Sequence, residues 1–452
     1  MDGPIPTLSE LEQQATIEGS KLQEIIDGFL ESYQYGLTQD LSTMIPSYVS
    51  RLPTGKETGT YFALDLGGTN LRVAAVTLLG DGKTEVEQKT YVIPTELKVG
   101  PVENLFDWVG LGVKELHDTI FSKGIDTSKN EMSMGVTFSF PIKQTAINRG
   151  VVMKMGKSFD ITGLEDRDVV ELLQEACKRK DIDVRITAIV NDCVGVLVAG
   201  AYKDQNTIMS AVIGTGTNAA CICQTSAIKK TEIPNNSAEY MIINTEWSIM
   251  GTTFLPFTRY DKLLDEQSSI PGFQPFEKMS SGMYLGELVR LVIVDYVKNF
   301  NLFGGELPGG MEIQYSIKAI QMSEIESDRT PEFTGILKLL TKNFNFDKIP
   351  SIEDMNILKE IVKIFTRRSS QLLAAAVASL IKFHCPEFPS VEREIRTAMD
   401  GSVYNHFHKY SFWMNKALRD IQQNKEIKKI KLVGIPDGGC IGAAITAMLY
   451  SH

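Results

Sequence analysis

Leu64-Asp65-Leu66-Gly67-Gly68-Thr69-Asn70-Leu71-Arg72-Val73 is the stretch of this chain that decides its fold. It follows a short apolar run and leads into another, residues 71–77, so it predicts two strands joined by a tight turn. Two adjacent glycines leave the turn almost without side-chain bulk, and its backbone N–H groups can therefore approach an anion closely. Asp65 stands just before the turn, where a carboxylate could hold a hydrated Mg²⁺. Gly-Gly between apolar runs is also an ordinary hairpin turn, so this stretch indicates a phosphate site only together with other motifs in the chain.

A second unit of the same kind follows later in the chain. A strand over residues 207–213 turns at Gly214-Thr215-Gly216-Thr217-Asn218, and residues 219–224 return as a strand. Two such units, separated by mixed α/β sequence, predict two related lobes. A third glycine-rich stretch, Pro436-Asp437-Gly438-Gly439-Cys440, precedes a helix expected near Gly442, whose positive end would point toward an anion. Together the three stretches favour a nucleotide held between the lobes, although no Walker loop is present.

The remaining pattern is mixed α/β in the first half and mainly helical in the second. An N-terminal helix begins after Thr7 or Ser9, carries apolar residues at helical spacing through Phe29 and stops at Pro46. Strand Ile186–Val190 ends in Asn191-Asp192, and a helix rich in small residues follows it. Further helices are expected over 105–121, 168–179, 283–298, 355–383 and 412–424, and further strands over 61–97, 132–140 and 428–433.

Size and charge limit the class of protein. A chain of 452 residues exceeds one compact core, so two domains are expected. The formal net charge of −10 disfavours nucleic acid and anionic membranes as partners. The six cysteines fit no zinc pattern and are expected as buried free thiols. The N-terminus lacks the regions of a signal peptide, and no apolar run could span a bilayer, so we expect a cytoplasmic protein without a membrane segment.

Several segments, taken in order, resemble the hexokinase family of the actin-like ATPase superfamily, in particular fungal hexokinases and glucokinases. The two glycine turns match the family's phosphate motifs, and the resemblance runs from about Leu8 to the C-terminus. The other matching segments are Phe138-Ser139-Phe140-Pro141 with Gln144 and Gly150, Val190-Asn191-Asp192-Cys193-Val194-Gly195, Asn244-Thr245-Glu246-Trp247, Gln274-Pro275-Phe276-Glu277-Lys278-Met279, Ser281-Gly282-Met283-Tyr284-Leu285-Gly286-Glu287 and Asp400-Gly401-Ser402-Val403-Tyr404.

The resemblance implies a two-lobed actin-like ATPase (ribonuclease H-like) α/β fold with a cleft between a small and a large domain. The small domain would hold residues 65–190 plus 441–452, and the large domain residues 1–64 plus 191–440. Sugar binding would draw the lobes together and expel water from the γ-phosphate. The implied activity is an ATP-dependent, Mg²⁺-assisted hexose 6-kinase, working as a monomer or homodimer.

The resemblance also assigns roles to single residues. Asp192 would be the general base for the sugar hydroxyl; the alternative is that it caps the helix that follows it. Lys157 would neutralise charge on the transferred phosphoryl group; the alternative is a solvated surface lysine. No histidine lies near the two glutamates, so no protein-bound metal is expected. The sugar contacts would be Ser139, Asn191, Asn218, Glu246 and Glu277, and the ATP contacts Asp65, Gly67, Gly68, Thr69, Asn70, Arg72, Gly214, Thr215, Gly216, Thr217, Gly438 and Gly439.

Because of departures from the family pattern, the sequence does not specify which sugar is the substrate. Gly156 replaces the usual threonine before Lys157, Ser248 replaces a glycine after Trp247, and the last glycine pair is followed by Cys440. Losing one hydroxyl contact would cost about 1 kcal/mol and open space. The substrate would then be glucose or another hexose, or an amino sugar such as N-acetylglucosamine. A sugar-sensing regulatory homologue with weak activity is a second hypothesis, and an actin- or chaperone-like ATPase with a protein partner is a third.

Overall fold

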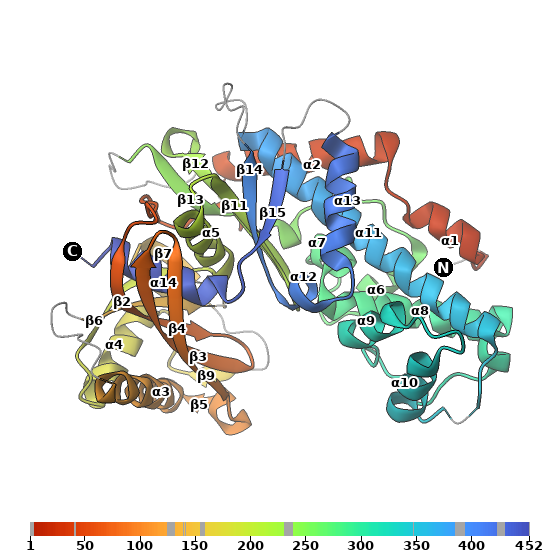
Figure 1. Cartoon of the computed structure of the whole chain (residues 1–452), viewed down its shortest axis with the longest axis horizontal. Coiled ribbons are helices and arrows are strands. Elements are labelled where there is room, and N and C mark those ends of the chain that lie inside the picture. Colours follow the sequence, from red (N-terminus) through yellow and green to blue (C-terminus); the bar gives the residue numbers. More distant parts are fainter. Residues whose placement is uncertain are drawn as a thin grey trace.

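Two β-sheets organise the chain, and Figure 1 shows them in two lobes that lie side by side. The computed structural model describes residues 4–39, 42–123, 132–138, 140, 142–153, 159–229, 238–346, 348–384, 394–422 and 430–451. Buried apolar side chains form two clusters, one within the first lobe and a larger one that fills the second lobe and the junction. This two-lobed, mixed α/β architecture confirms the predicted fold class.

The sheet of the first lobe has five strands in the order β10-β6-β2-β3-β4. Strands β2 (Thr58–Leu66), β3 (Asn70–Gly80) and β4 (Lys83–Val92) form an antiparallel meander. Strand β6 (Met132–Phe138) pairs with β2 in parallel, and β10 (Val184–Val190) pairs with β6 in parallel. Helices α3 (Val102–Ser122) and α4 (Val169–Arg179) pack into the apolar cluster on one face.

The sheet of the second lobe repeats this arrangement. Strands β11 (Thr207–Ile213), β12 (Thr217–Gln224) and β13 (Tyr240–Asn244) form an antiparallel meander. Strand β14 (Ile395–Asp400) pairs with β11 in parallel, and β15 (Ile430–Gly434) pairs with β14 in parallel. The short strand β1 (Ile45–Pro46) pairs with β13 at the edge. The repeated order and strand directions confirm the prediction of two related lobes.

Two helices cross from one lobe to the other. Helix α5 (Asp192–Lys203) follows β10 of the first sheet and packs on β11 and β14 of the second. Helix α14 (Gly438–Leu449) follows β15 of the second sheet and packs on β6 and β2 of the first. The helices touch through glycines, since a Cβ at Gly442 would lie 1.8 Å from the carbonyl oxygen of Gly195. This crossing brings the beginnings of both helices together.

Helices fill the rest of the second lobe (Figure 1). The 33-residue helix α11 (Ile352–His384) runs through its centre and contacts α2, α8 and α13. The other helices of this lobe are α1 (Leu8–Ala15), α2 (Gly19–Thr38), α6 (Arg259–Gln267), α7 (Pro275–Ser280), α8 (Gly282–Phe300), α9 (Ala319–Ser327), α10 (Thr334–Phe344), α12 (Ser402–His406) and α13 (Tyr410–Gln422), with 3₁₀ turns η2 (Thr225–Ala227), η3 (Trp247–Ile249) and η4 (Leu302–Gly305).

The first lobe also holds smaller elements. The 3₁₀ turn η1 (Thr95–Lys98) lies beside α3. Short pairs of strands are β5 (Val99–Pro101) with β9 (Asp160–Thr162), and β7 (Ile142–Ala146) with β8 (Arg149–Val152).

Two helix boundaries differ from the sequence-based expectations. The N-terminal helix is two helices, because Thr16 ends α1 in an extended conformation and the next residue, Ile17, is buried. Helix α14 begins at Gly438, not near Gly442, so the glycine pair forms its first turn rather than a loop. The division into two domains stays a prediction, and β2 of the first sheet begins at Thr58, ahead of its first boundary.

Other expectations concern cysteines and membranes. Cys177, Cys193, Cys221, Cys223 and Cys440 are buried free thiols, as expected; Cys385 lies outside the described residues. No helix in the described part of the chain combines the length and apolar character that a bilayer crossing requires.

Candidate functional site

Asp192 lies where the chain passes from the first lobe to the second. Strand β10 ends at Val190, and α5 begins at Asp192. The cap of α5 is Asn191, whose Oδ1 accepts a hydrogen bond from Cys193 N at 3.0 Å. Asp192 stands in the first turn, where its Oδ1 also accepts from Cys193 N, at 2.7 Å. The alternative that Asp192 is the helix cap is therefore wrong, because Asn191 occupies that position.

Asn218, Asn244 and Glu246 form a closed polar cluster at the end of the second sheet. Asn218 Nδ2 donates to Asn244 Oδ1 at 2.8 Å and to Glu246 Oε1 at 3.0 Å, and Asn244 Nδ2 donates to Glu246 Oε1 at 2.7 Å. Ala220 of β12 pairs with Asn244 of β13, and extending this antiparallel register by two residues sets Asn218 opposite Glu246. Burial raises the pKa of Glu246, and the nearby charge of Asp192 raises it further. Asp192 therefore lies within electrostatic reach of this cluster.

Glu277 comes from the first turn of α7 and contacts the second glycine turn. Its Oε2 accepts a hydrogen bond from Thr217 N at 3.0 Å. Gly216 leaves room for this carboxylate, since a Cβ there would lie 2.6 Å from Oε2. The fully buried Trp247 supports the same turn, because its Nε1 donates to Thr217 Oγ1 at 3.2 Å. One sugar candidate and one phosphate candidate are thus in direct contact.

The first glycine turn joins β2 to β3. Gly67 N donates to Asn70 O at 3.0 Å, and Thr69 O accepts from Ile93 N at 2.9 Å. Lys98 Nζ donates to Gly68 O at 2.9 Å and brings a cation to the turn. A Cβ at Gly67 would meet only Asn70 O, at 3.5 Å, so the fold itself has room for a side chain there.

Asp65 and Arg72 lie directly opposite each other on β2 and β3. Their charged groups approach to 3.7 Å. Burial, and then the charge of Asp65, raise the pKa of the Cys440 thiol, so Asp65 lies near the first turn of α14. A carboxylate, a guanidinium and a helix N-terminus are therefore gathered at this end of the first sheet.

The second glycine turn is bonded to the beginning of α8. Gly214 N donates to Gly216 O, while Gly282 N donates to Gly214 O and Met283 N to Thr215 O. A Cβ at Gly214 would come no closer than 3.6 Å to any atom outside its chain neighbours. Like Gly67, Gly214 is therefore not required by packing.

The first turn of α14 lies against Asp192 and β14. A Cβ at Gly439 would be 3.7 Å from the Cβ of Asp192. Gly438 N donates to Asp400 Oδ2 at 3.0 Å, and Gly401 N donates to Asp400 Oδ1 at 2.7 Å. Burial raises the pKa of Asp400. Asp192 thus lies between the third glycine stretch and the cluster around Glu246.

Some candidates cannot be placed, and some residues were not anticipated. Ser139 and Lys157, with Gly156, lie outside the described residues. The sequence reading missed Asn244, Asp400 and Lys98 as partners in the site. Asn244 was within reach of prediction, since it begins the segment Asn244-Thr245-Glu246-Trp247 that resembles the family. Lys98 carries no such signal. Within the described ranges, no group of three or more histidine, cysteine, aspartate or glutamate side chains is arranged to hold a metal ion.

The two repeated sheets, each with a glycine turn after its first strand, define a two-lobed protein of the actin-like ATPase type. Two hexokinase family models match residues 7–202 and 208–449. Hexokinase-1 of Spinacia oleracea is 35% identical over 453 residues, covering 98% of this chain and 91% of that protein. The hexokinase of Kluyveromyces lactis is 34% identical, covering 97% and 91%. The structure of hexokinase from Schistosoma mansoni complexed with glucose matches with a TM-score of 0.81 and 31% identity, covering 97% of each chain.

The chain therefore belongs to the hexokinase family, as its motifs predicted. It is a hexose kinase, an ATP:hexose 6-phosphotransferase. N-acetylglucosamine is not favoured as its substrate, since the relatives from Spinacia oleracea and Kluyveromyces lactis are both named hexokinases.

Proposed function

We propose that this protein phosphorylates the 6-hydroxyl of a glucose-type hexose, with Asp192 as the general base. The observation that carries the proposal is the position of Asp192, between the first turn of α14 and the polar cluster around Glu246. A carboxylate placed beside a sugar hydroxyl can take its proton during attack on a phosphoryl group. The sugar oxygen bonds to the γ-phosphorus of ATP, the bond to the β–γ bridging oxygen breaks, Asp192 receives the proton and ADP leaves.

The sugar would be held by side chains with complementary hydrogen-bonding groups. Asn218 of β12, Glu246 just before η3 and Glu277 of α7 supply amide and carboxylate groups. Asn191 and Ser139 are assigned to the sugar by the family resemblance; of these, Asn191 directly precedes the base. Each buried polar group left unpaired would cost about 1–3 kcal/mol, so this set favours a ligand rich in hydroxyls.

The phosphates of ATP would be bound at the glycine turns. Gly67 and Gly214 lack side chains although the fold has room for them, which favours the close approach of a ligand to the backbone. The first turn of α14, with Gly438 and Gly439, adds N–H groups at the positive end of a helix. Further ATP contacts are assigned to Gly68, Thr69, Asn70, Arg72, Thr215, Gly216 and Thr217, and Lys157 is assigned to the transferred phosphoryl group.

Asp65 would hold Mg²⁺, directly or through water. Mg²⁺ usually binds one or two carboxylates and completes its coordination with substrate phosphates and water. Asp65 fits this pattern as a partly exposed carboxylate at the end of β2, near the first glycine turn. The ion would offset negative charge on the phosphates and fix their orientation.

A sugar-sensing homologue with weak turnover remains the second candidate, favoured by Ser248, which is buried in η3 directly after Trp247. Release of ADP, measured in a coupled assay with glucose, mannose, fructose and N-acetylglucosamine, separates the two. We expect sugar-dependent release with glucose and none above background for the Asp192→Ala variant. No release with any sugar would contradict the proposed catalysis.

A further inference from the structure

Helix α7, which carries Glu277, is too short to be stable without contacts to the rest of the protein. It has six residues, begins after Gln274 in the left-handed conformation (φ 55°) and has no side-chain cap. Isolated helices of this length are unstable in water, so tertiary contacts must fix it. The position of Glu277 against Thr217 therefore depends on the contacts that α7 makes with neighbouring elements. One such contact is the ion pair of the buried Lys278 with Asp265, near the middle of α7.

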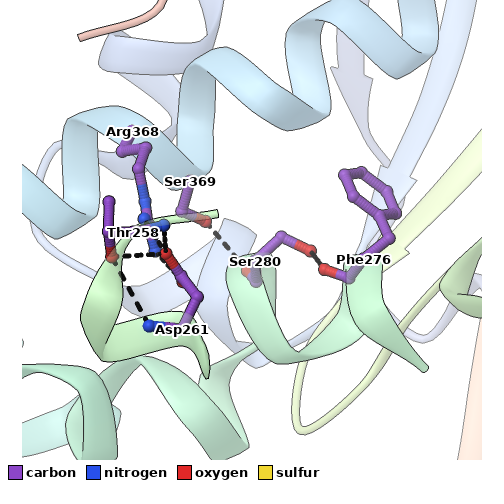
Figure 2. A network of polar contacts seen from close by, with 6 residues as sticks. All are labelled: Thr258, Asp261, Phe276, Ser280, Arg368 and Ser369. Carbon is purple, nitrogen blue, oxygen red and sulfur yellow. Dashed lines mark hydrogen bonds and ion pairs between the residues drawn. The ribbon is translucent and has the colours of Figure 1, made fainter. Parts of the chain in front are cut away.

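The contact at the C-terminal end of α7 comes from the centre of α11. Ser369 Oγ donates to the carbonyl oxygen of Ser280, the last residue of α7, at 2.8 Å (Figure 2). The hydroxyl of Tyr410 lies 2.5 Å from Ser369 Oγ, and since Ser369 gives its proton to Ser280, Tyr410 donates to Ser369. Ser280, Ser369 and Tyr410 are all fully buried, so no water competes for these bonds. Ser280 Oγ in turn donates to Phe276 O, which ties both ends of α7 together.

The neighbouring residue fixes the rotation of α11 at this point. Arg368 Nη1 and Nη2 each donate to a different oxygen of Asp261, both at 2.7 Å. Asp261 is also bonded to Thr258, at the beginning of α6. Figure 2 shows this ion pair beside the bond from Ser369 to Ser280. A two-bond pair permits little rotation, so the Ser369 hydroxyl is kept facing α7.

We propose that Ser369 is a positioning residue that sets the place of Glu277, and hence the affinity for the sugar. The inference rests on the proposed role of Glu277 as a sugar contact. Loss of the hydroxyl releases the C-terminal end of α7 and lets the Glu277 carboxylate move away from Thr217 N. Small displacements of such groups have large effects on binding and rate.

The chain offers a matched control on the same helix. Ser379 is also fully buried on α11, and its Oγ also donates to a helix carbonyl at 2.8 Å, but its acceptor is Ile26 O of α2. Ser369→Ala and Ser379→Ala should therefore lower the melting temperature similarly. Only Ser369→Ala should weaken glucose binding, by about five- to twenty-fold in calorimetry without ATP, and raise KM for glucose more than it lowers kcat.

The reference variant is Glu277→Ala. If Glu277→Ala weakens glucose binding and Ser369→Ala does not, the positioning role is wrong while the sugar contact stands. If both serine variants weaken glucose binding equally, the effect is general destabilisation and the proposal is also wrong. If Glu277→Ala binds glucose normally, the proposed role of Glu277 fails instead. Should Ser369→Ala not fold, Ser369→Cys takes its place, because a thiol is only a weak hydrogen-bond donor: a weakened glucose affinity supports the proposal, and an unchanged affinity overturns it.

Discussion

The contact between Gly216 and Glu277 predicts how a single substitution in the second glycine turn changes the affinity for glucose. In a Gly216→Ala variant, the new Cβ would lie 2.6 Å from Glu277 Oε2, whereas ordinary contacts begin at 3.4 Å. The φ angle of Gly216 is not positive, so alanine introduces no backbone strain and the carboxylate must yield. A retreat of about 0.8 Å directed away from the turn would lengthen its 3.0 Å bond with Thr217 N to about 3.8 Å, beyond hydrogen-bonding distance. A hydrogen bond to a charged group contributes about 1.5–3 kcal/mol.

If the displaced Glu277 loses a hydrogen bond of this strength to the sugar, the affinity for glucose becomes about ten- to a hundred-fold weaker. Titration calorimetry without ATP measures it directly. Gly214→Ala is the control, because its Cβ would meet nothing closer than 3.6 Å in the same turn. The reasoning is refuted if Gly216→Ala binds glucose within about twofold of the parent protein, or if both alanine variants lose the same affinity.

Three further substitutions test the site and the crossing of α5 and α14. Asp192→Ala should abolish ADP release while glucose binding measured by calorimetry stays within about tenfold of the parent; near-normal turnover would remove Asp192 from its role as base. Burial raises the pKa of Glu246 above its ordinary value of 4.5, so the folded protein binds a proton on this carboxylate more tightly than the unfolded chain does. The free energy of unfolding therefore falls as the pH rises from 4.5 toward the raised pKa. Melting curves of Glu246→Gln should therefore show a smaller fall over this pH range and at least parental stability at neutral pH, with weaker glucose binding; a less stable variant at neutral pH contradicts this. Gly442→Ala should cost about 3 kcal/mol or more, because its Cβ would lie 1.8 Å from Gly195 O; an unchanged denaturation midpoint would contradict the close crossing of α5 and α14.

The hairpins and the lobes could be predicted from the sequence, because their signals are local. Glycine turns between apolar strands are visible in the chain itself, and the repetition of this unit indicated the repeated sheets. The long periodic pattern of α11 was equally plain, and the helix extends the predicted 355–383 only slightly, to Ile352–His384. Periodicity also predicted the N-terminal helix, but it gave no sign that Ile17 is buried between two separate helices.

The contacts within the site could not be predicted, because they depend on register and packing between distant segments. Asn218 meets Glu246 through the pairing of β12 with β13, and Asn244 closes the cluster from the same register. Gly438 and Gly439 suggested a loop because glycine disfavours helices, yet they form the first turn of α14. The close crossing with α5 favours glycine at Gly438, since a Cβ there would lie 3.1 Å from Val196 Cγ2 on α5.

The central claim is that a hexose binds with its reacting hydroxyl beside Asp192, held by the groups around Glu246 and Glu277. A crystal structure of the protein with glucose tests this claim most directly. We expect the 6-hydroxyl of glucose within hydrogen-bonding distance of the Asp192 carboxylate, and other sugar hydroxyls bonded to Glu246 and Glu277. Glucose bound away from Asp192, or without contact to either glutamate, would contradict the account.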